Sequence, residues 1–156
     1  MTKLSLEKIR ILLTAGMVAF LLSLSPTVYA ADEVAIDVEV GDGLAYNVKT
    51  IEVAAGSKVK LTITHKGKLP KAAMGHNWVL LAKDADRNKF MSAAMTAQKT
   101  NYIPEKMKGQ VLAHTKIVGG GESDTIEFTA PEAGEYVFLC SFPGHGGVMN
   151  GKLLVK

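Results

Sequence analysis

The strongest constraint on this chain is a segment near its C-terminus that carries three metal-binding side chains between two β-prone runs. Cys140, the only cysteine, is followed by His145 after five positions and by Met149 after four more. Pro143 and the glycines on either side of His145 disfavour both a helix and a strand ladder. We therefore expect a rigid loop between two strands, with the three side chains close together.

The chemistry of these side chains predicts a copper site. A thiolate, an imidazole and a thioether suit copper that cycles between Cu(I) and Cu(II), held by one cysteine and two histidines with a long axial methionine. The second histidine must come from elsewhere, and His76, in M-G-H-N-W-V-L, is the candidate. Each residue alone also has an ordinary interpretation: Cys140 or His76 in the core, Met149 as a filler of core gaps, His145 on the surface. Their combination favours one copper ion bound by all four.

Residues 1–30 are typical of a cleavable secretory signal. Three basic residues open the chain, an apolar run extends from Ile11 to Leu24, and Pro26 ends it before Val28-Tyr29-Ala30. The run is shorter than the ~20 apolar residues of a membrane span, although an uncleaved membrane anchor is the alternative. We expect residues 31–156 to form one exported domain that has no membrane span after cleavage.

Removing this segment leaves a nearly balanced charge. The sequence has 18 Lys and Arg against 15 Asp and Glu; residues 1–30 hold three and one of these, which leaves 15 against 14. No basic stripe is interleaved with aromatic residues, so nucleic-acid binding is not expected. A lone cysteine in an exported protein has to be buried, metal-bound or reactive, and a metal would protect Cys140 from oxidation.

Alternating apolar residues predict a mostly β-structure. The predicted strands cover residues 33–40, part of 44–53, 58–65, 76–81, 111–118, 124–128, 135–139 and 151–156. Residues 84–98 have alanine, methionine and phenylalanine at three- and four-residue spacing instead, which predicts one short helical insertion. Seven or eight short strands favour an all-β fold, a two-sheet antiparallel sandwich with Greek-key connections.

Three segments resemble the azurin family of small bacterial type 1 blue copper proteins. They are G-H-N-W-V-L, A-H-T-K-I-V-G-G-G-E and F-L-C-S-F-P-G-H-G-G-V-M-N-G. The resemblance implies a cupredoxin-like sandwich in which His76, Cys140 and His145 are strong equatorial ligands of the copper. Met149 and the Gly75 carbonyl oxygen would be weak axial ligands.

The resemblance also implies roles for residues around the ligands. The Asn77 side chain would tie the two ligand loops together, and the backbone N–H groups of Asn77 and Phe142 would donate to the Cys140 sulfur, which tunes the potential. Ser141 stands where azurins commonly have threonine. A docking patch around the exposed edge of His145 would consist of Leu69, Ala73, Met74, Met95, Phe142, Pro143 and Val148.

The function implied by the resemblance is that of a periplasmic one-electron carrier, a monomer that turns over no substrate and is not an enzyme. Electrons would pass through the edge of His145 to redox proteins that dock transiently, such as cytochrome c-type donors and reductase or oxidase acceptors. A copper carrier with an open, exchangeable site is one alternative. An oxidase is disfavoured because Leu139 and Ser141, rather than histidines, flank Cys140.

Some features fit the resemblance less closely or have two interpretations. Azurins usually carry a disulfide remote from the copper, which a chain with one cysteine cannot form. His65 resembles a histidine whose protonation can couple to redox state, but it is equally a candidate core residue. Leu69 and Met95 would belong to the core if they did not form the patch. Trp78 is expected to pack in the core, and His114 is assigned no role.

Overall fold

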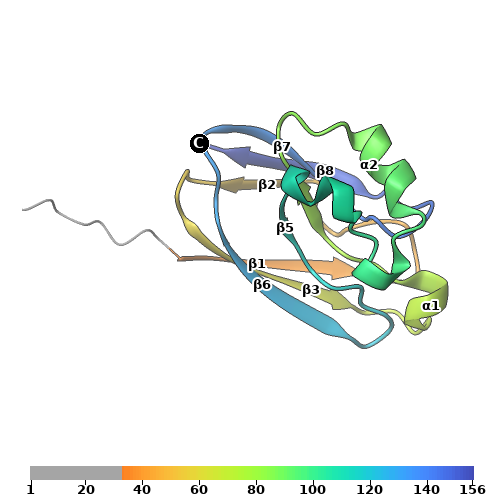
Figure 1. Ribbon diagram of the computed structural model, residues 1–156. Coiled ribbons are helices and arrows are strands. Elements are labelled where there is room, and N and C mark those ends of the chain that lie inside the picture. The colour runs from red at the N-terminus through yellow and green to blue at the C-terminus, as the bar shows by residue number, and fades with distance from the viewer. Residues whose placement is uncertain (1–32) are drawn as a thin grey trace, which may run out of the picture.

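Two β-sheets packed face to face make up the computed structural model, which describes residues 33–156 (Figure 1). One sheet has three strands in the order β1 (Glu33–Val40), β3 (Lys58–His65) and β6 (Ser123–Thr129). The other has five strands in the order β2 (Thr50–Val53), β8 (Asn150–Val155), β7 (Gly134–Leu139), β4 (Val79–Leu81) and β5 (Val111–His114). The predicted all-β sandwich is confirmed, while the predicted secretory signal lies outside the described residues.

Short helical segments fill two of the connections between strands. They are α1 (Lys71–Met74), α2 (Arg87–Ala94) and two 3-10 helices, η2 (Gln98–Thr100) and η3 (Glu105–Gln110). The insertion predicted at 84–98 is present, but its α-helix begins after Asp86, whose side chain accepts hydrogen bonds from the N–H groups of Asn88 and Lys89. Helices α1 and η3 were not predicted, because segments of four and six residues are too short to show a helical periodicity.

The alternating residues of the strands form the core between the sheets. Val38 of β1 and Leu61 and Ile63 of β3 are fully buried, while their charged neighbours along the strands are exposed. Trp78 and Phe138 belong to the same buried cluster, with ring centroids 5.5 Å apart. Removing these apolar side chains from water is the main source of stability in such a sandwich.

Strand β4 is buried on both faces, which explains why its sequence is continuously apolar. Leu80 belongs to the core between the sheets, whereas Val79 and Leu81 pack in a second cluster with Phe90 of α2 and with Ile103. The five-stranded sheet is therefore covered on its outer face by the segment that contains α2. This segment also lies beside the loop between β7 and β8 (Figure 1).

The directions of two strand pairs differ from the predicted antiparallel sandwich. β1 pairs in parallel with β3, and β2 pairs in parallel with β8, whereas the other strand pairs are antiparallel. β1 and β3 are parallel because β2, which lies between them in the sequence, belongs to the opposite sheet. The chain crosses to the second sheet and back, so β3 returns in the direction of β1.

Three predicted strands are shorter in the structure. The strand expected within 44–53 covers only Thr50–Val53, and the one expected at 76–81 begins at Val79. The strand expected at 111–118 ends at His114, after which Val118 forms an isolated bridge with His76. Residues 76–78 thus leave the regular ladder just where the predicted ligand His76 stands.

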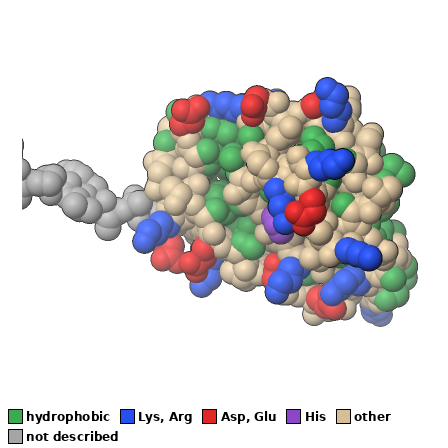
Figure 2. Space-filling model, in the orientation of Figure 1, with side chains coloured by type: hydrophobic (Ala, Val, Ile, Leu, Met, Phe, Trp, Pro, Cys, Tyr) green, Lys and Arg blue, Asp and Glu red, His purple; other side chains and the backbone are tan. Residues whose placement is uncertain are grey.

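Different parts of the chain lie at the two ends of the sandwich. The start of β1 and the C-terminus lie at one end, whereas α1 and the loop between β7 and β8 lie at the other (Figure 1). Hydrophobic side chains are visible at the α1 end of the surface and also over the face nearer the start of β1 (Figure 2). Within residues 33–156 no helix has the length and apolar character needed to cross a membrane.

Shortening Leu61, which is fully buried at the centre of β3, tests the assignment of the core. Leu61→Ala should lower the free energy of unfolding by about 2–5 kcal/mol, because it leaves a cavity in addition to the lost burial. Leu112→Ala is the control, since Leu112 is 43% exposed, and it should cost less than about 1 kcal/mol. Urea denaturation of both variants measures the difference; equal losses would contradict this core.

Candidate metal centre

His76, Cys140 and His145 meet in one buried cluster at the α1 end of the sandwich. The Nδ1 atoms of the two histidines are 3.2 Å apart. The Cys140 Sγ atom lies 3.9 Å from Nδ1 of His76 and 3.7 Å from Nδ1 of His145. None of the three residues is more than 6% exposed. Imidazole and thiolate donors bound to a shared ion at about 2.0–2.3 Å lie roughly 3.3–3.8 Å apart. One ion therefore fits among these three atoms.

Neighbouring strands of one sheet bring the donors together. Val79 at the start of β4 pairs with Leu139 at the end of β7, so residues just outside this pair come close in space. His76 is held there by its backbone: its N–H donates to the Val118 carbonyl at 3.0 Å, and its carbonyl accepts from the Val118 N–H at 2.8 Å. Cys140 directly follows Leu139.

Backbone hydrogen bonds close the loop from Cys140 to Met149. The Cys140 N–H donates to the Met149 carbonyl at 3.0 Å, and the Met149 N–H donates to the His145 carbonyl at 2.8 Å. The His145 N–H donates to the Phe142 carbonyl at 3.0 Å. The backbone of the loop thus fixes where the His145 ring stands relative to Cys140.

A hydrogen bond on its far side orients the His76 ring. Nε2 lies 3.0 Å from the Gly41 carbonyl oxygen, and a carbonyl can only accept, so Nε2 carries the proton and donates. The lone pair is then on Nδ1, which faces Cys140 and His145. A metal-binding histidine typically donates its other ring N–H to a carbonyl or carboxylate in this way.

Burial shifts the ionisation of all three side chains toward their neutral forms. It raises the pKa of the Cys140 thiol to about 11, an effect opposed by the backbone N–H groups of Asn77 and Phe142, which point at the sulfur. It lowers the pKa of His76 to about 4, with a further contribution from the charge of His145. Burial also lowers the pKa of His145. Two neutral imidazoles are ready to bind a metal, while the thiol must first lose its proton.

Asn77 joins the two segments that carry the donors. Its side-chain carbonyl accepts from the Ser141 N–H at 2.8 Å, and its amide donates to the Ser141 hydroxyl at 2.8 Å. The amide also lies 3.3 Å from the Asn101 carbonyl, and the backbone carbonyl of Asn77 accepts from the Tyr46 hydroxyl at 2.6 Å. This is the linking arrangement expected from the sequence, and the hydroxyl of Ser141 takes part in it.

Gly75 and Met149, the two expected axial ligands, both lie beside the cluster. A Cβ atom on Gly75 would be 2.5 Å from the Lys71 carbonyl oxygen, 2.5 Å from an Ile117 methyl group and 3.1 Å from the Phe142 ring, so only glycine fits. Met149 is fully buried and is bonded to Cys140 and His145 through its backbone. Coordination by either residue stays a prediction.

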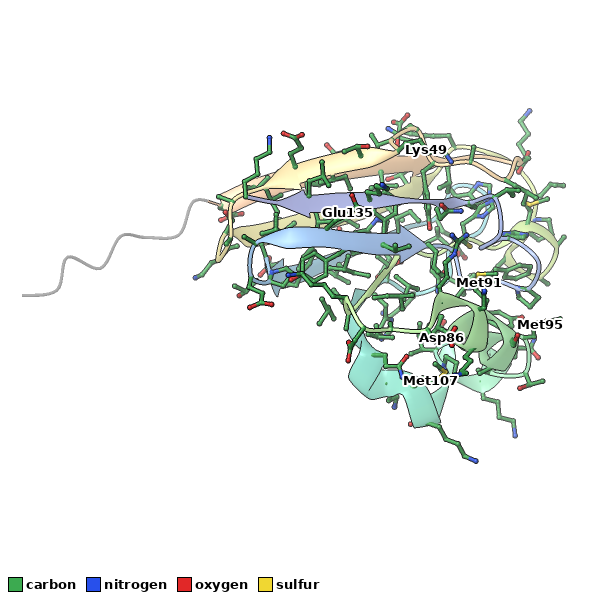
Figure 3. The ribbon with its side chains drawn as sticks, turned by 90° about the horizontal axis from the view of Figure 1, so that it is seen from above. Lys49, Asp86, Met91, Met95, Met107 and Glu135 are labelled. Carbon is green, nitrogen blue, oxygen red and sulfur yellow. The ribbon has the colours of Figure 1, made fainter. Side chains whose placement is uncertain are left out.

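The predicted docking patch comes from three segments at the α1 end. Leu69 is 41% exposed, Met95 61% and Val148 60%, so Leu69 and Met95 are not core residues. Ala73 is exposed, and Met74, Phe142 and Pro143 are half-buried. Met95 lies at the end of α2 that points away from the termini (Figure 3). The ring of Phe142 packs 4.7 Å from the His145 ring, which connects the patch to the cluster.

The other residues of interest occupy clear positions. His65 is buried; its Nδ1 accepts from the Gly67 N–H and its Nε2 lies 3.0 Å from the Met74 carbonyl, so both ring nitrogens have partners. Its coupling to redox state stays a prediction. Trp78 packs between Phe128 and Phe138, as expected. His114 is exposed.

Two supports of the cluster were not predicted from the sequence. One is the Gly41 carbonyl, which holds the His76 ring. The other is Asp42, whose carboxylate accepts from the N–H groups of Lys68 and Leu69 at 2.9–3.0 Å and so anchors the loop before α1. A backbone carbonyl leaves no side-chain signal, and Gly41-Asp42-Gly43 is indistinguishable from an ordinary turn.

The donor set of the cluster fits copper. One thiolate and two imidazoles facing a common point, with a thioether nearby, is the combination of ligands that blue copper sites use. His76, Cys140 and His145 form a group in which the potential ligand atoms all lie within 4.8 Å of one another. The carboxylates that calcium or magnesium would require are absent from this group in the described part of the chain.

Comparisons with known proteins agree with this chemistry. The sequence model for copper binding proteins of the plastocyanin/azurin family matches residues 32–156. An azurin of Bordetella pertussis is 41% identical over 142 residues, which cover 88% of this chain and 93% of the relative. Auracyanin A, a blue copper protein from Chloroflexus aurantiacus, superposes with a TM-score of 0.71 and 30% identity over 80% of this chain and 99% of its own. An azurin from Methylomonas sp. strain J does so with a TM-score of 0.69 and 33% identity over 81% and 99%.

Replacing Asn77 by leucine tests its linking role. Asn77→Leu keeps the approximate volume but leaves the Ser141 N–H buried without an acceptor, and should lower the free energy of unfolding of the metal-free protein by about 2–4 kcal/mol. The same change at Asn88, which is exposed on α2, is the control and should be nearly neutral. Thermal and urea unfolding measure both; a neutral Asn77→Leu variant would refute the link.

Proposed function

The chain belongs to the plastocyanin/azurin family of copper-binding proteins, and we propose that it is a periplasmic one-electron carrier with a single type 1 copper ion. The observation that carries the proposal is the convergence of His76, Cys140 and His145 within one buried site. The family and this donor set support a blue copper electron carrier. The cellular location, the partners and the route of the electron are the finer parts of the proposal.

The residues of the site would bind the metal with different strengths. His76, Cys140 and His145 would be its strong ligands, and Met149 and the Gly75 carbonyl oxygen would be weak ones. When bound, the copper ion supplies a centre that changes between Cu(I) and Cu(II), so that one electron is stored without turnover of a substrate. The N–H groups of Asn77 and Phe142 would withdraw electron density from the Cys140 sulfur and so help to set the potential.

The hydrogen-bonded frame keeps the ligands in place during a change of charge. The His76 ring is fixed by the Gly41 carbonyl, and the loop from Cys140 to Met149 is closed on itself. Asn77 fixes one segment to the other. A frame of this kind changes little between the two oxidation states, which lowers the cost of transferring an electron, and burial keeps water from the site.

The docking patch supports transient association with redox proteins. His145 is the only one of the three equatorial candidates with measurable exposure, 6% against 0% for His76 and Cys140. Its ring packs against the Phe142 ring at 4.7 Å, and its carbonyl accepts from the N–H of the exposed Val148 at 3.1 Å. An electron would therefore leave through His145 into a partner seated on the patch. An apolar surface is desolvated easily and few charges need pairing, so partners such as cytochrome c-type donors and reductase or oxidase acceptors would be released quickly.

Enzymatic turnover and copper delivery are both supported less well than electron transfer. Leu139 and Ser141 flank Cys140, so the neighbouring histidines that connect such a cysteine to further copper ions in oxidases are not in place. A copper carrier would need an open site, whereas these ligands are buried and tied down by Asn77. Export by the secretory signal predicted at residues 1–30 would place the carrier in the periplasm, where we expect it to act as a monomer.

Replacing the thiol tests the metal assignment. Cys140→Ser should abolish the intense visible absorption of the oxidised copper protein, because that absorption is charge transfer from sulfur to Cu(II). His114→Asn, at an exposed histidine without an assigned role, is the control and should keep the band. Absorption and electron-resonance spectra of both copper-loaded proteins measure this. Retention of the band in a correctly folded Cys140→Ser protein, checked by circular dichroism, would exclude the proposed centre.

Placing a charge in the patch tests the electron route. Val148→Glu should slow electron self-exchange between oxidised and reduced protein by roughly tenfold or more, since two like charges would face each other in the encounter complex. The visible band should not change, because Val148 is not a ligand. Leu112→Glu adds the same charge at an exposed position on β5 and should leave the rate nearly unaltered. Equal rates for the two variants would remove the patch from the docking role.

A further inference from the structure

Arg87, the first residue of α2, contacts the loop segment that follows His145. Its Nη2 donates to the Gly146 carbonyl at 2.7 Å and to the Gly147 carbonyl at 3.3 Å. The side-chain amide of Asn150 donates to the same two carbonyls, at 3.2 Å each. The two peptide groups next to His145 are therefore held from two sides, by α2 and by the start of β8.

The helix also packs closely against this part of the loop. A Cβ atom on Gly146 would lie 2.8 Å from the Cys140 carbonyl oxygen and 3.0 Å from the Met91 sulfur. Met91 stands one turn after Arg87 on α2 and lies between this helix and the strands (Figure 3). A larger residue at 146 would push α2 away from the loop, so glycine permits the short contact that Arg87 makes.

The positive charge of Arg87 has no acidic partner in the described part of the chain. The ion pairs formed there all involve lysines, including Lys89 with Asp86 on the same helix. The Nε atom of Arg87 is buried without a hydrogen-bond partner. The guanidinium is thus directed at the loop carbonyls alone, and its charge is only partly screened by water.

A cation in this position favours one oxidation state of the proposed centre. The oxidised site carries one more positive charge than the reduced site, so repulsion by Arg87 raises the energy of the oxidised form more. The contact to the Gly146 and Gly147 carbonyls brings this charge to the residues that immediately follow a ligand. A charge on the opposite, exposed face of α2 would be screened by solvent.

We propose that Arg87 is a positioning residue that fixes the Gly146–Gly147 segment beside His145 and whose charge raises the reduction potential of the centre. The second part rests on the proposed function, since it requires a bound redox ion. The sequence gives only a weak signal for this role: Arg87 is the only arginine beyond residue 10.

Two variants separate the charge of Arg87 from its shape. Arg87→Lys keeps the charge but loses the planar fork that reaches both carbonyls, whereas Arg87→Gln loses the charge. Lys89→Gln, which removes a cation whose side chain is 79% exposed, is the matched control. The midpoint potential is measured on the copper-loaded proteins at low and high salt, and amide hydrogen exchange of residues 145–149 is measured on the metal-free proteins.

Arg87→Gln should shift the equilibrium with a fixed reference couple roughly three- to tenfold toward the oxidised protein, and Arg87→Lys should shift it much less. Both variants should speed amide exchange in the loop, and Lys89→Gln should change neither quantity. An unchanged potential in Arg87→Gln would overturn the electrostatic role, and unchanged exchange in both Arg87 variants would overturn the positioning role. If the wild-type protein showed no copper band, the proposed function would fail, while the exchange measurement would still test the positioning role.

Discussion

Two hydrogen bonds of 2.8 Å between the Asn77 side chain and Ser141 join the chain segments on which the metal centre depends. The two residues are 64 positions apart in the sequence, and each stands next to one of the donors, His76 or Cys140. Since both partners are buried, the alternative to these bonds is a dry, unpaired N–H group, which is costly. The frame therefore determines where the donors stand, and the Tyr46 hydroxyl holds the Asn77 backbone from the other side.

The exclusion of water from this region also determines the protonation of the donor side chains. A thiol in a water-exposed loop would ionise and oxidise more readily than Cys140, because burial raises the pKa of Cys140 to about 11. The N–H groups of Asn77 and Phe142 oppose this effect, so the site already contains dipoles that favour a thiolate. Burial keeps His76 neutral as well, which leaves its Nδ1 lone pair free. The core that stabilises the sandwich thus also prepares the ligands.

The sequence was most informative where several metal-binding residues lie close together along the chain. Cys140, His145 and Met149 lie within ten positions, and the need for one more imidazole led to His76. Strands β1 and β3 were predicted with their observed bounds because alternation reports directly which face is buried. Sheet membership was not predictable in this way, since the parallel pairing of β1 with β3 depends on where β2 docks. Contacts made by backbone carbonyls, such as Gly41 with His76 and Gly146 with Arg87, were also invisible, because a carbonyl is common to every residue.

The described chain starts and ends at the end of the sandwich opposite α1 and the loop between β7 and β8 (Figure 1), which is the loop that carries Cys140 and His145. Lys156 follows β8, which runs away from the ligand loop for its whole length. A surface linker or a fused reductase joined at Lys156 would therefore leave the face around Val148 and Met95 turned outward. The fold thus offers an attachment point for oriented immobilisation on an electrode, with the end that carries His76, Cys140 and His145 toward solution.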